Sequence, residues 1–299
     1  MNTPRDERGQ ALVFTVLVLT VLLGMFALVL DVGSWFRAQR DVQSTADAAA
    51  LAAAQELPES TGRASALAAE YVGKNGGGSA EISFITSISG PDTVRVRIQR
   101  PAPGFFARVV GIDSVTVRAT ASARSSAIDQ ARYAAPIAVD VRHPLLGCLP
   151  SPCFGEQTTL DLEKVGPGAF RLLNLDGSRG GTGPSTLAEW VAKGFDGMMP
   201  LGNYFSDPGA KFNSSQMKSS MNFILGKELL FPLYDSTVGT GSNLTYHVIG
   251  WVGFTVSSFS GNGSKGTVTG SFQRVIWDAI GSESPTQSAY GAHTISLVE

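Results

Sequence analysis

The sequence has few of the side chains that bind metals or carry out nucleophilic catalysis. Its 299 residues include only two cysteines and three histidines. His143, His247 and His293 are scattered, and none has the spacing of a metal site or a catalytic triad. Cys148 and Cys153 have no second cysteine pair that would complete a zinc site. We therefore expect no metal, no cofactor and no catalytic residue, and we expect that the protein is not an enzyme.

Motifs for nucleotides and for metal-dependent adhesion are missing or incomplete. There is no Walker A sequence, and the G-x-G-x-x-G of Gly261 to Gly266 lies between two expected strands, where no helix N-terminus meets a pyrophosphate. Asp176-Gly177-Ser178 begins like an adhesion loop of the form Asp-x-Ser-x-Ser, but Gly180 stands where the second serine belongs. The formal net charge of -2 gives no argument for a nucleic-acid partner.

Charge is absent from Ala11 to Leu30, which is the longest apolar run in the chain. A bilayer core needs roughly 20 apolar residues in a helix, and this run has that length. A cleavable signal peptide has a shorter apolar region followed directly by a small-residue cleavage site, whereas Asp31-Val32-Gly33 follows here. The run therefore predicts a transmembrane helix over residues 11–30 that is retained as an anchor.

The orientation of this anchor is not decided by the flanking charges. Arg5 and Arg8 precede the run, and Arg37 and Arg40 follow it. The closely spaced Cys148 and Cys153 favour an oxidising exterior, where they would form a disulfide; two free thiols are the alternative. We expect a cytoplasmic N-terminus and extracytoplasmic C-terminal domains.

The helical pattern continues beyond the apolar run and ends before Pro58. Apolar residues recur at spacings of three and four and form one helical face. Packing of this face against the protein's own domain is the favoured interpretation, and packing against other copies, with self-association through the anchor helix, is the alternative. The face consists of Val42, Ala46, Ala49, Ala50, Ala53 and Leu57.

The remaining pattern predicts an α+β protein with three parts. Residues 1–57 form the membrane anchor and stalk helix, residues 58–132 a small α/β domain, and residues 133–299 a β-rich extracytoplasmic domain. Strands are expected at 81–89, 93–100, 114–123, 136–141, 158–162, 170–175, 245–259 and 267–280. Helices are expected at 65–74, 105–110, 186–193 and 214–225. The polar tail from Ser282 is expected to be loosely held.

The N-terminal segment resembles the TadE/TadG-like proteins of Tad (Flp) pilus assembly over about residues 8–55. The order of its pieces carries the resemblance: Arg8-Gly9-Gln10-Ala11, the apolar run, Asp31 and Gly33, Gln43, and Ala46-Asp47-Ala48-Ala49 with Leu51. The resemblance implies a bacterial single-pass membrane protein with no enzymatic activity. Processed relatives carry a glutamate five residues after the cleaved glycine. Phe14 stands at that position counted from Gly9, which favours an unprocessed, permanent anchor.

Two hypotheses for the function follow. The first is a non-catalytic membrane-anchored protein of Tad (Flp)-type pilus assembly or envelope anchoring, with the lipid bilayer and other pilus-assembly or envelope proteins as partners. The alternative is a cell-surface binding module whose C-terminal domain recognises a glycan or protein ligand.

Overall fold

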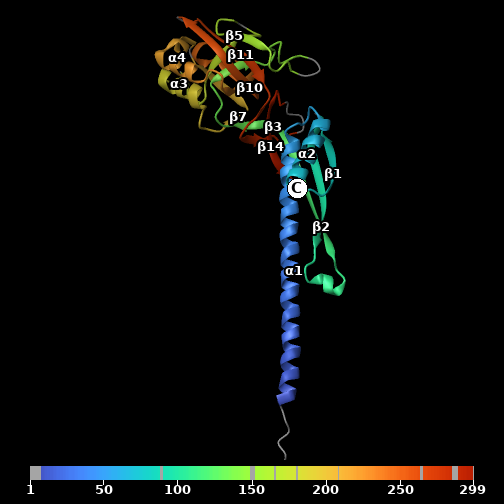
Figure 1. Ribbon diagram of the computed structural model, residues 1–299. Coiled ribbons are helices and arrows are strands. Elements are labelled where there is room, and N and C mark those ends of the chain that lie inside the picture. The colour runs from blue at the N-terminus through green and yellow to red at the C-terminus, as the bar shows by residue number, and fades with distance from the viewer. Residues whose placement is uncertain are drawn as a thin grey trace, which may run out of the picture. The chain divides into compact units, whose positions relative to one another are not determined.

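A computed structural model describes residues 8–87, 90–148, 152–164, 166–179, 181–207, 209–262, 265–284 and 289–298. The chain divides into two compact units (Figure 1). The first comprises Met1–Thr86, Gly90–Arg124 and Ser296–Glu299, and the second Ser87–Ser89 and Ser125–Ile295. A long N-terminal helix and a shorter second helix are followed by domains that are mostly β-sheet, so the α+β fold class is confirmed.

The first unit is built on one helix, α1 (Arg8–Ala54), which is followed by α2 (Thr61–Lys74). The Ser60 side chain caps α2 by accepting a hydrogen bond from the Arg63 N–H. Three strands then follow, β1 (Ser79–Ser87), β2 (Gly90–Pro103) and β3 (Ser114–Ala131), with the 3-10 helix η1 (Ala107–Val110) between β2 and β3. The C-terminal half of α1 contacts α2 and β2, and these contacts form the core of this unit.

The predicted alternation of β2 is confirmed. Val94, Val96 and Ile98 are fully buried, while Arg95, Arg97 and Gln99 are exposed. β2 and β3 pair antiparallel without interruption from Thr93↔Arg124 to Pro103↔Ser114. They therefore form a long ribbon whose closed end carries η1.

The second unit contains a sheet in the order β5-β11-β10-β8-β6-β4-β9, with an additional pairing of β10 to β9. β10, β8, β6, β4 and β9 are thereby joined in a closed ring of strands. Helices α3 (Pro184–Lys193) and α4 (Ser215–Phe223) contact one another beside it. The strand bounds are β4 (Ile137–Asp140), β5 (Gln157–Asp161), β6 (Phe170–Asn174), β8 (Gly202–Asp207), β9 (Glu228–Val238), β10 (Thr245–Asn262) and β11 (Lys265–Gln273).

Both faces of this sheet are buried, because successive residues of a strand point to opposite sides. Ile137, Leu172 and Phe231 belong to a core cluster that also includes side chains of α3 and α4. Their chain neighbours Ala138, Leu173 and Leu230 belong to a second cluster. The second unit thus has enough buried apolar area for a core of its own.

The remaining strands belong to the other sheet, whose order is β1-β2-β3-β14-β12, with β13 and β7 pairing to β3. These are β7 (Met199–Pro200), β12 (Val275–Ile276), β13 (Ala279–Gly281) and β14 (Ala292–Val298). The expected strand over 267–280 is therefore wrong in extent, because β11 ends at Gln273. The expectation of a loosely held tail is wrong for β14, which pairs within this sheet and buries Ala292 and His293.

Candidate functional site: a membrane anchor and its clasp

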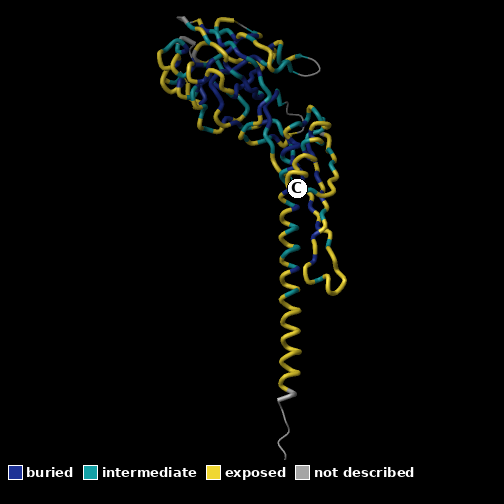
Figure 2. Tube along the Cα trace, viewed as in Figure 1, coloured by how far each residue is buried: buried dark blue, intermediate teal, exposed yellow. Residues whose placement is uncertain are grey.

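The N-terminal half of α1 has no protein around it. Among the described residues, one helix, Ala11–Ala54, is long and apolar enough to cross a membrane; its most apolar window has a mean hydropathy of 2.8 and is 0 % buried. The residues from Ala11 to Leu30 are exposed, apart from the half-buried Ala27, and this exposed stretch of α1 is visible in Figure 2. Such a continuous apolar surface is costly in water and is typical of a segment that faces lipid.

Asp31 follows this apolar surface directly and is only 1 % exposed. Its carboxylate accepts hydrogen bonds from the backbone N–H groups of Phe105 (2.8 Å), Phe106 (3.0 Å) and Ala107. These N–H groups lie at the start of η1. The first N–H groups of a helix have no carbonyl acceptor within the helix. The carboxylate therefore caps η1 from a different element and fixes the end of the β2–β3 ribbon to α1.

Three further side chains of α1 bond to the backbone of the same ribbon. Trp35 donates its indole N–H to the Pro103 carbonyl (3.2 Å). The amide of Gln39 donates to the Arg118 carbonyl and accepts from the Arg118 N–H. Gln43 donates to the Thr120 carbonyl (3.3 Å) and to the Asp47 carboxylate (2.8 Å). Asp31, Trp35, Gln39 and Gln43 recur every four residues, and together we name them the clasp.

The Ala-rich face occupies the C-terminal part of α1, from Val42 onward, and is buried. Val42, Ala46, Ala49, Ala50 and Ala53 have an exposed fraction of 0 %. Leu57 is equally buried but lies in the turn after the helix, because α1 ends at Ala54 and not at residue 57 as expected. Because the side chain of alanine is a single methyl group, α2 and β2 can pack close to the helix backbone. The favoured interpretation, packing against the protein's own domain, is confirmed.

The comparison with known proteins concerns this part of the chain. Residues 9–56 match the family described as "Putative Flp pilus-assembly TadE/G-like". Residues 37–123 match the family described as "Putative Tad-like Flp pilus-assembly". These matches confirm the resemblance read from the sequence, and they support a role related to pilus assembly. No curated protein and no solved structure matches the chain.

The residues that carried the resemblance have different positions in this Tad-like region. Arg8, Gly9 and Gln10 form the first turn of α1, and Ala11 begins the exposed span. Asp31 and Gln43 belong to the clasp, and Asp47 hydrogen-bonds to Gln43. Ala46 and Ala49 are buried, whereas Ala48 and Leu51 are half-buried. Gly33 is exposed, and a Cβ at its position would meet no atom within 4 Å.

The clasp was not identified from the sequence, although two of its members were recognised as motif residues. The sequence signal is a polar or indole side chain at each fourth position after the apolar run. Its partners are backbone groups 68 to 79 residues away, and no local pattern indicates them.

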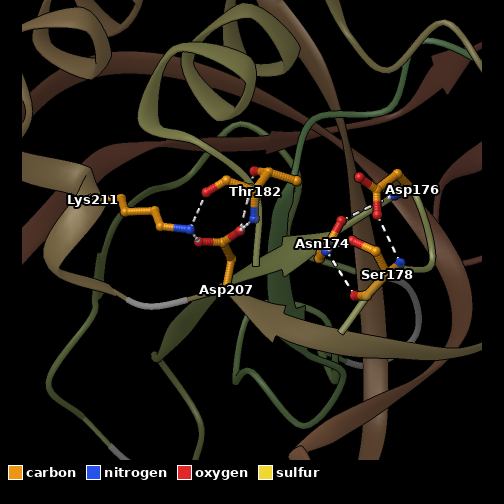
Figure 3. A network of polar contacts seen from close by, with 6 residues as sticks. All are labelled: Asn174, Asp176, Ser178, Thr182, Asp207 and Lys211. Atoms are coloured by element: carbon orange, nitrogen blue, oxygen red, sulfur yellow. Dashed lines mark hydrogen bonds and ion pairs between the residues drawn. The ribbon is translucent and has the colours of Figure 1, made fainter. Parts of the chain in front are cut away.

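The second unit contains a buried polar network around Asp207 (Figure 3). The Asp207 carboxylate accepts from the Thr182 N–H (2.7 Å) and hydroxyl (3.2 Å), and it forms an ion pair with Lys211 at 2.7 Å. Lys211 also donates to the Thr182 carbonyl. These contacts join the segment before α3 to η2 (Gly209–Asn213), and they indicate a structural role.

The adhesion-like sequence lies beside this network and forms a turn. Asp176 accepts from the Ser178 N–H (2.7 Å), and Asn174 accepts from the Asp176 N–H and donates to Ser178 (Figure 3). The hydrogen bond to Ser178 lowers the pKa of Asp176. The carboxylate is thus used within the turn, and Gly180 lies outside the described residues. Among those residues, no group of three or more His, Cys, Asp or Glu side chains could hold a metal ion.

The two cysteines form a disulfide, with Cys148 and Cys153 Sγ atoms 2.00 Å apart. The Cys153 N–H donates to the Leu145 carbonyl at 2.8 Å, and the Leu145 N–H donates to His143 Nδ1. His143 is 4 % exposed, and burial lowers its pKa against the opposing effect of Asp140. A neutral His143 is needed to accept this hydrogen bond, so it supports the loop that the disulfide closes.

Proposed function

We propose that this protein is a non-catalytic, single-pass membrane protein of Tad (Flp)-type pilus assembly or envelope anchoring. The single observation that supports this best is the continuity of α1, which runs from an exposed apolar span into the buried Ala-rich face without a break. The two family matches connect that helix to pilus assembly. Other pilus-assembly or envelope proteins are the expected partners.

The proposed topology has the N-terminus in the cytoplasm and residues 58–132 and 133–299 outside it. The disulfide supports this direction, because such bonds persist in oxidising compartments. Self-association through the anchor is also part of the proposal. Thr20 and Gly24 lie four residues apart on the exposed span, and a Cβ on Gly24 would meet no atom within 4 Å, so a second helix has room to approach the backbone there.

Gene deletion with complementation tests this function. We expect the deletion strain to lose surface pili or attachment, and the wild-type gene to restore them. A Leu22→Lys, Leu23→Lys double variant should fail to restore the pili. It should also be lost from the carbonate-resistant membrane fraction, because charged side chains within a membrane span are costly. Lysine at exposed Ser44 is the matched control and should behave as wild type. Intact piliation in the deletion strain would overturn the proposal.

A further inference from the structure

The closed end of the β2–β3 ribbon exposes a cluster of large apolar side chains. Val109 and Val110 are 88 % and 76 % exposed, and Phe105 is 66 % exposed. Exposed turns are normally built from small and polar residues, so such a cluster marks an interaction surface. We name these side chains the apolar tip: Phe105, Phe106, Val109, Val110 and Ile112.

The clasp holds the apolar tip at the level where the apolar span of α1 ends. Asp31 is the residue after Leu30, and its carboxylate binds the N–H groups of Phe105 and Phe106. A groove of about 400 Å³ lies between the two elements, with Val29 and Leu30 on one side and both phenylalanines on the other. The end of the span and the tip therefore lie side by side, and both are exposed (Figure 2).

The backbone of the tip is also suited to a medium without water. Phe105, Phe106 and Ala107 donate their N–H groups to Asp31. The N–H groups of Gly104, Val109, Gly111 and Ile112 donate to carbonyls within the tip itself, at 2.9 to 3.1 Å. Each backbone N–H group that is already hydrogen-bonded lowers the cost of moving the turn out of water toward lipid. The three bonds to Asp31 are the ones that a turn cannot make by itself.

We propose that the apolar tip inserts into the outer interfacial layer of the bilayer beside the anchor helix, as a second contact with phospholipid. The inference rests on the membrane anchoring proposed above. Lipid is the occupant because the tip lies beside the end of the span. Trp35 lies one turn beyond Asp31, where indoles are common at membrane interfaces. The side chains of Arg37, Arg40 and Arg108 are exposed near this level and are suited to lipid phosphates.

Site-specific fluorescence in proteoliposomes tests the insertion. The full chain has no cysteines besides the disulfide pair, so single Val109→Cys, Leu23→Cys and Thr120→Cys variants can be labelled with the dye NBD without reduction. All three positions are exposed, so the label should not disturb the fold. The vesicles contain phosphatidylcholine, phosphatidylglycerol and, in separate preparations, a phospholipid with a nitroxide near its headgroup or along its acyl chain.

The label at Val109 should show blue-shifted emission that the nitroxide lipid quenches. Leu23, in the span, is the positive control, and Thr120, bonded beside Gln43 further along the ribbon, should remain water-exposed and unquenched. Quenching at Leu23 with a water-exposed Val109 would overturn the inference and leave the anchor intact. A Val109 label that is shielded from aqueous iodide but not quenched by lipid would also overturn it, because the tip would then contact protein. Lack of quenching at Leu23 would refute the anchor as well.

Discussion

Asp31 shows why a carboxylate, and no similar side chain, belongs at the end of the apolar span. Three backbone N–H groups converge on its two oxygens, and the residue is almost fully buried. An ionised carboxylate only accepts hydrogen bonds, so both oxygens are available to these donors. An asparagine would turn an NH₂ group toward at least one N–H group, leaving donors opposed and unsatisfied.

We therefore expect Asp31→Asn to lower the Tm of the detergent-solubilised protein and to loosen the apolar tip. Trypsin cleavage after the exposed Arg108 measures the loosening, and it should be several-fold faster in the variant than in wild type. Asp41→Asn replaces an exposed carboxylate on the same helix and should change neither quantity. Equal cleavage rates in the two variants would contradict a capping role for Asp31.

His293 gives the second unit a dependence on pH. It is 4 % exposed, and burial, helped by the charge of Arg274, lowers its pKa from 6.5 to about 4. Between these values the unfolded chain binds a proton that the folded chain does not. The free energy of unfolding should therefore fall as the pH is lowered from 6.5 toward 4, by about 3 kcal/mol for such a shift.

Thermal unfolding followed by circular dichroism at pH 7, 6 and 5 measures this effect. His293→Asn keeps a polar group near the Nδ1 position, which lies 3.3 Å from the Ser125 hydroxyl, but it does not titrate. The variant should be less stable at pH 7 and should lose less stability on acidification than wild type. A parallel decline of the two proteins would assign the pH dependence to other groups.

At the scale of elements, the spacing of the clasp matches the geometry of the ribbon. Four residues of an α-helix turn through about 400°, so a four-residue repeat winds slowly around the helix axis. A two-stranded β ribbon is itself twisted. The clasp side chains can therefore follow the ribbon and hydrogen-bond to its backbone from Pro103 to Thr120. The four-residue repeat is visible in the sequence, but the backbone groups that it binds are not. Those groups are identified only when the fold brings the β2–β3 ribbon back beside α1.

A substitution at Ala46 tests how tightly α2 and β2 pack against the C-terminal half of α1. Ala46→Leu adds a branched side chain at a position with no exposed surface, and overpacking of this kind costs about 1 to 3 kcal/mol. We expect a lower Tm with the helix content retained. Ser44→Leu makes a similar change at an exposed position of α1 and should be nearly neutral. A neutral Ala46→Leu would mean that the face is less tightly packed than the structure indicates.

The strands that sequence reasoning missed lack the features by which strands are recognised. β9 contains Pro232, which normally argues against a paired strand, yet it lies opposite Trp251 in the ladder with β10. β14 lies in a polar tail, and its place is fixed by a parallel pairing with β12. By contrast, β2 and the N-terminal part of β3 alternate strictly between apolar and polar residues, and both were predicted from the sequence. The positions of β9 and β14 depend instead on their pairing with other strands.

At the scale of the whole molecule, the redox state of the cysteines tests the proposed topology. Cells are quenched with acid, and thiols are alkylated in denaturant with and without prior reduction. An extracytoplasmic disulfide predicts that Cys148 and Cys153 are labelled only after reduction. Cys148→Ser should leave Cys153 labelled without reduction, which controls for reagent access. Full labelling of the wild type without reduction would favour the opposite orientation.

The continuity of α1 has a mechanical meaning. From Asp31 to Ala54 the helix extends about 36 Å at 1.5 Å per residue, with no flexible joint to the span. A tilt of the span by about 10° moves the far end of this lever sideways by about 6 Å. With the span in a bilayer, as proposed, a sideways force on the packed end would act on the bilayer as a torque. In the proposed topology, the helix would therefore couple a load on the extracytoplasmic part of the protein to tilt of the span.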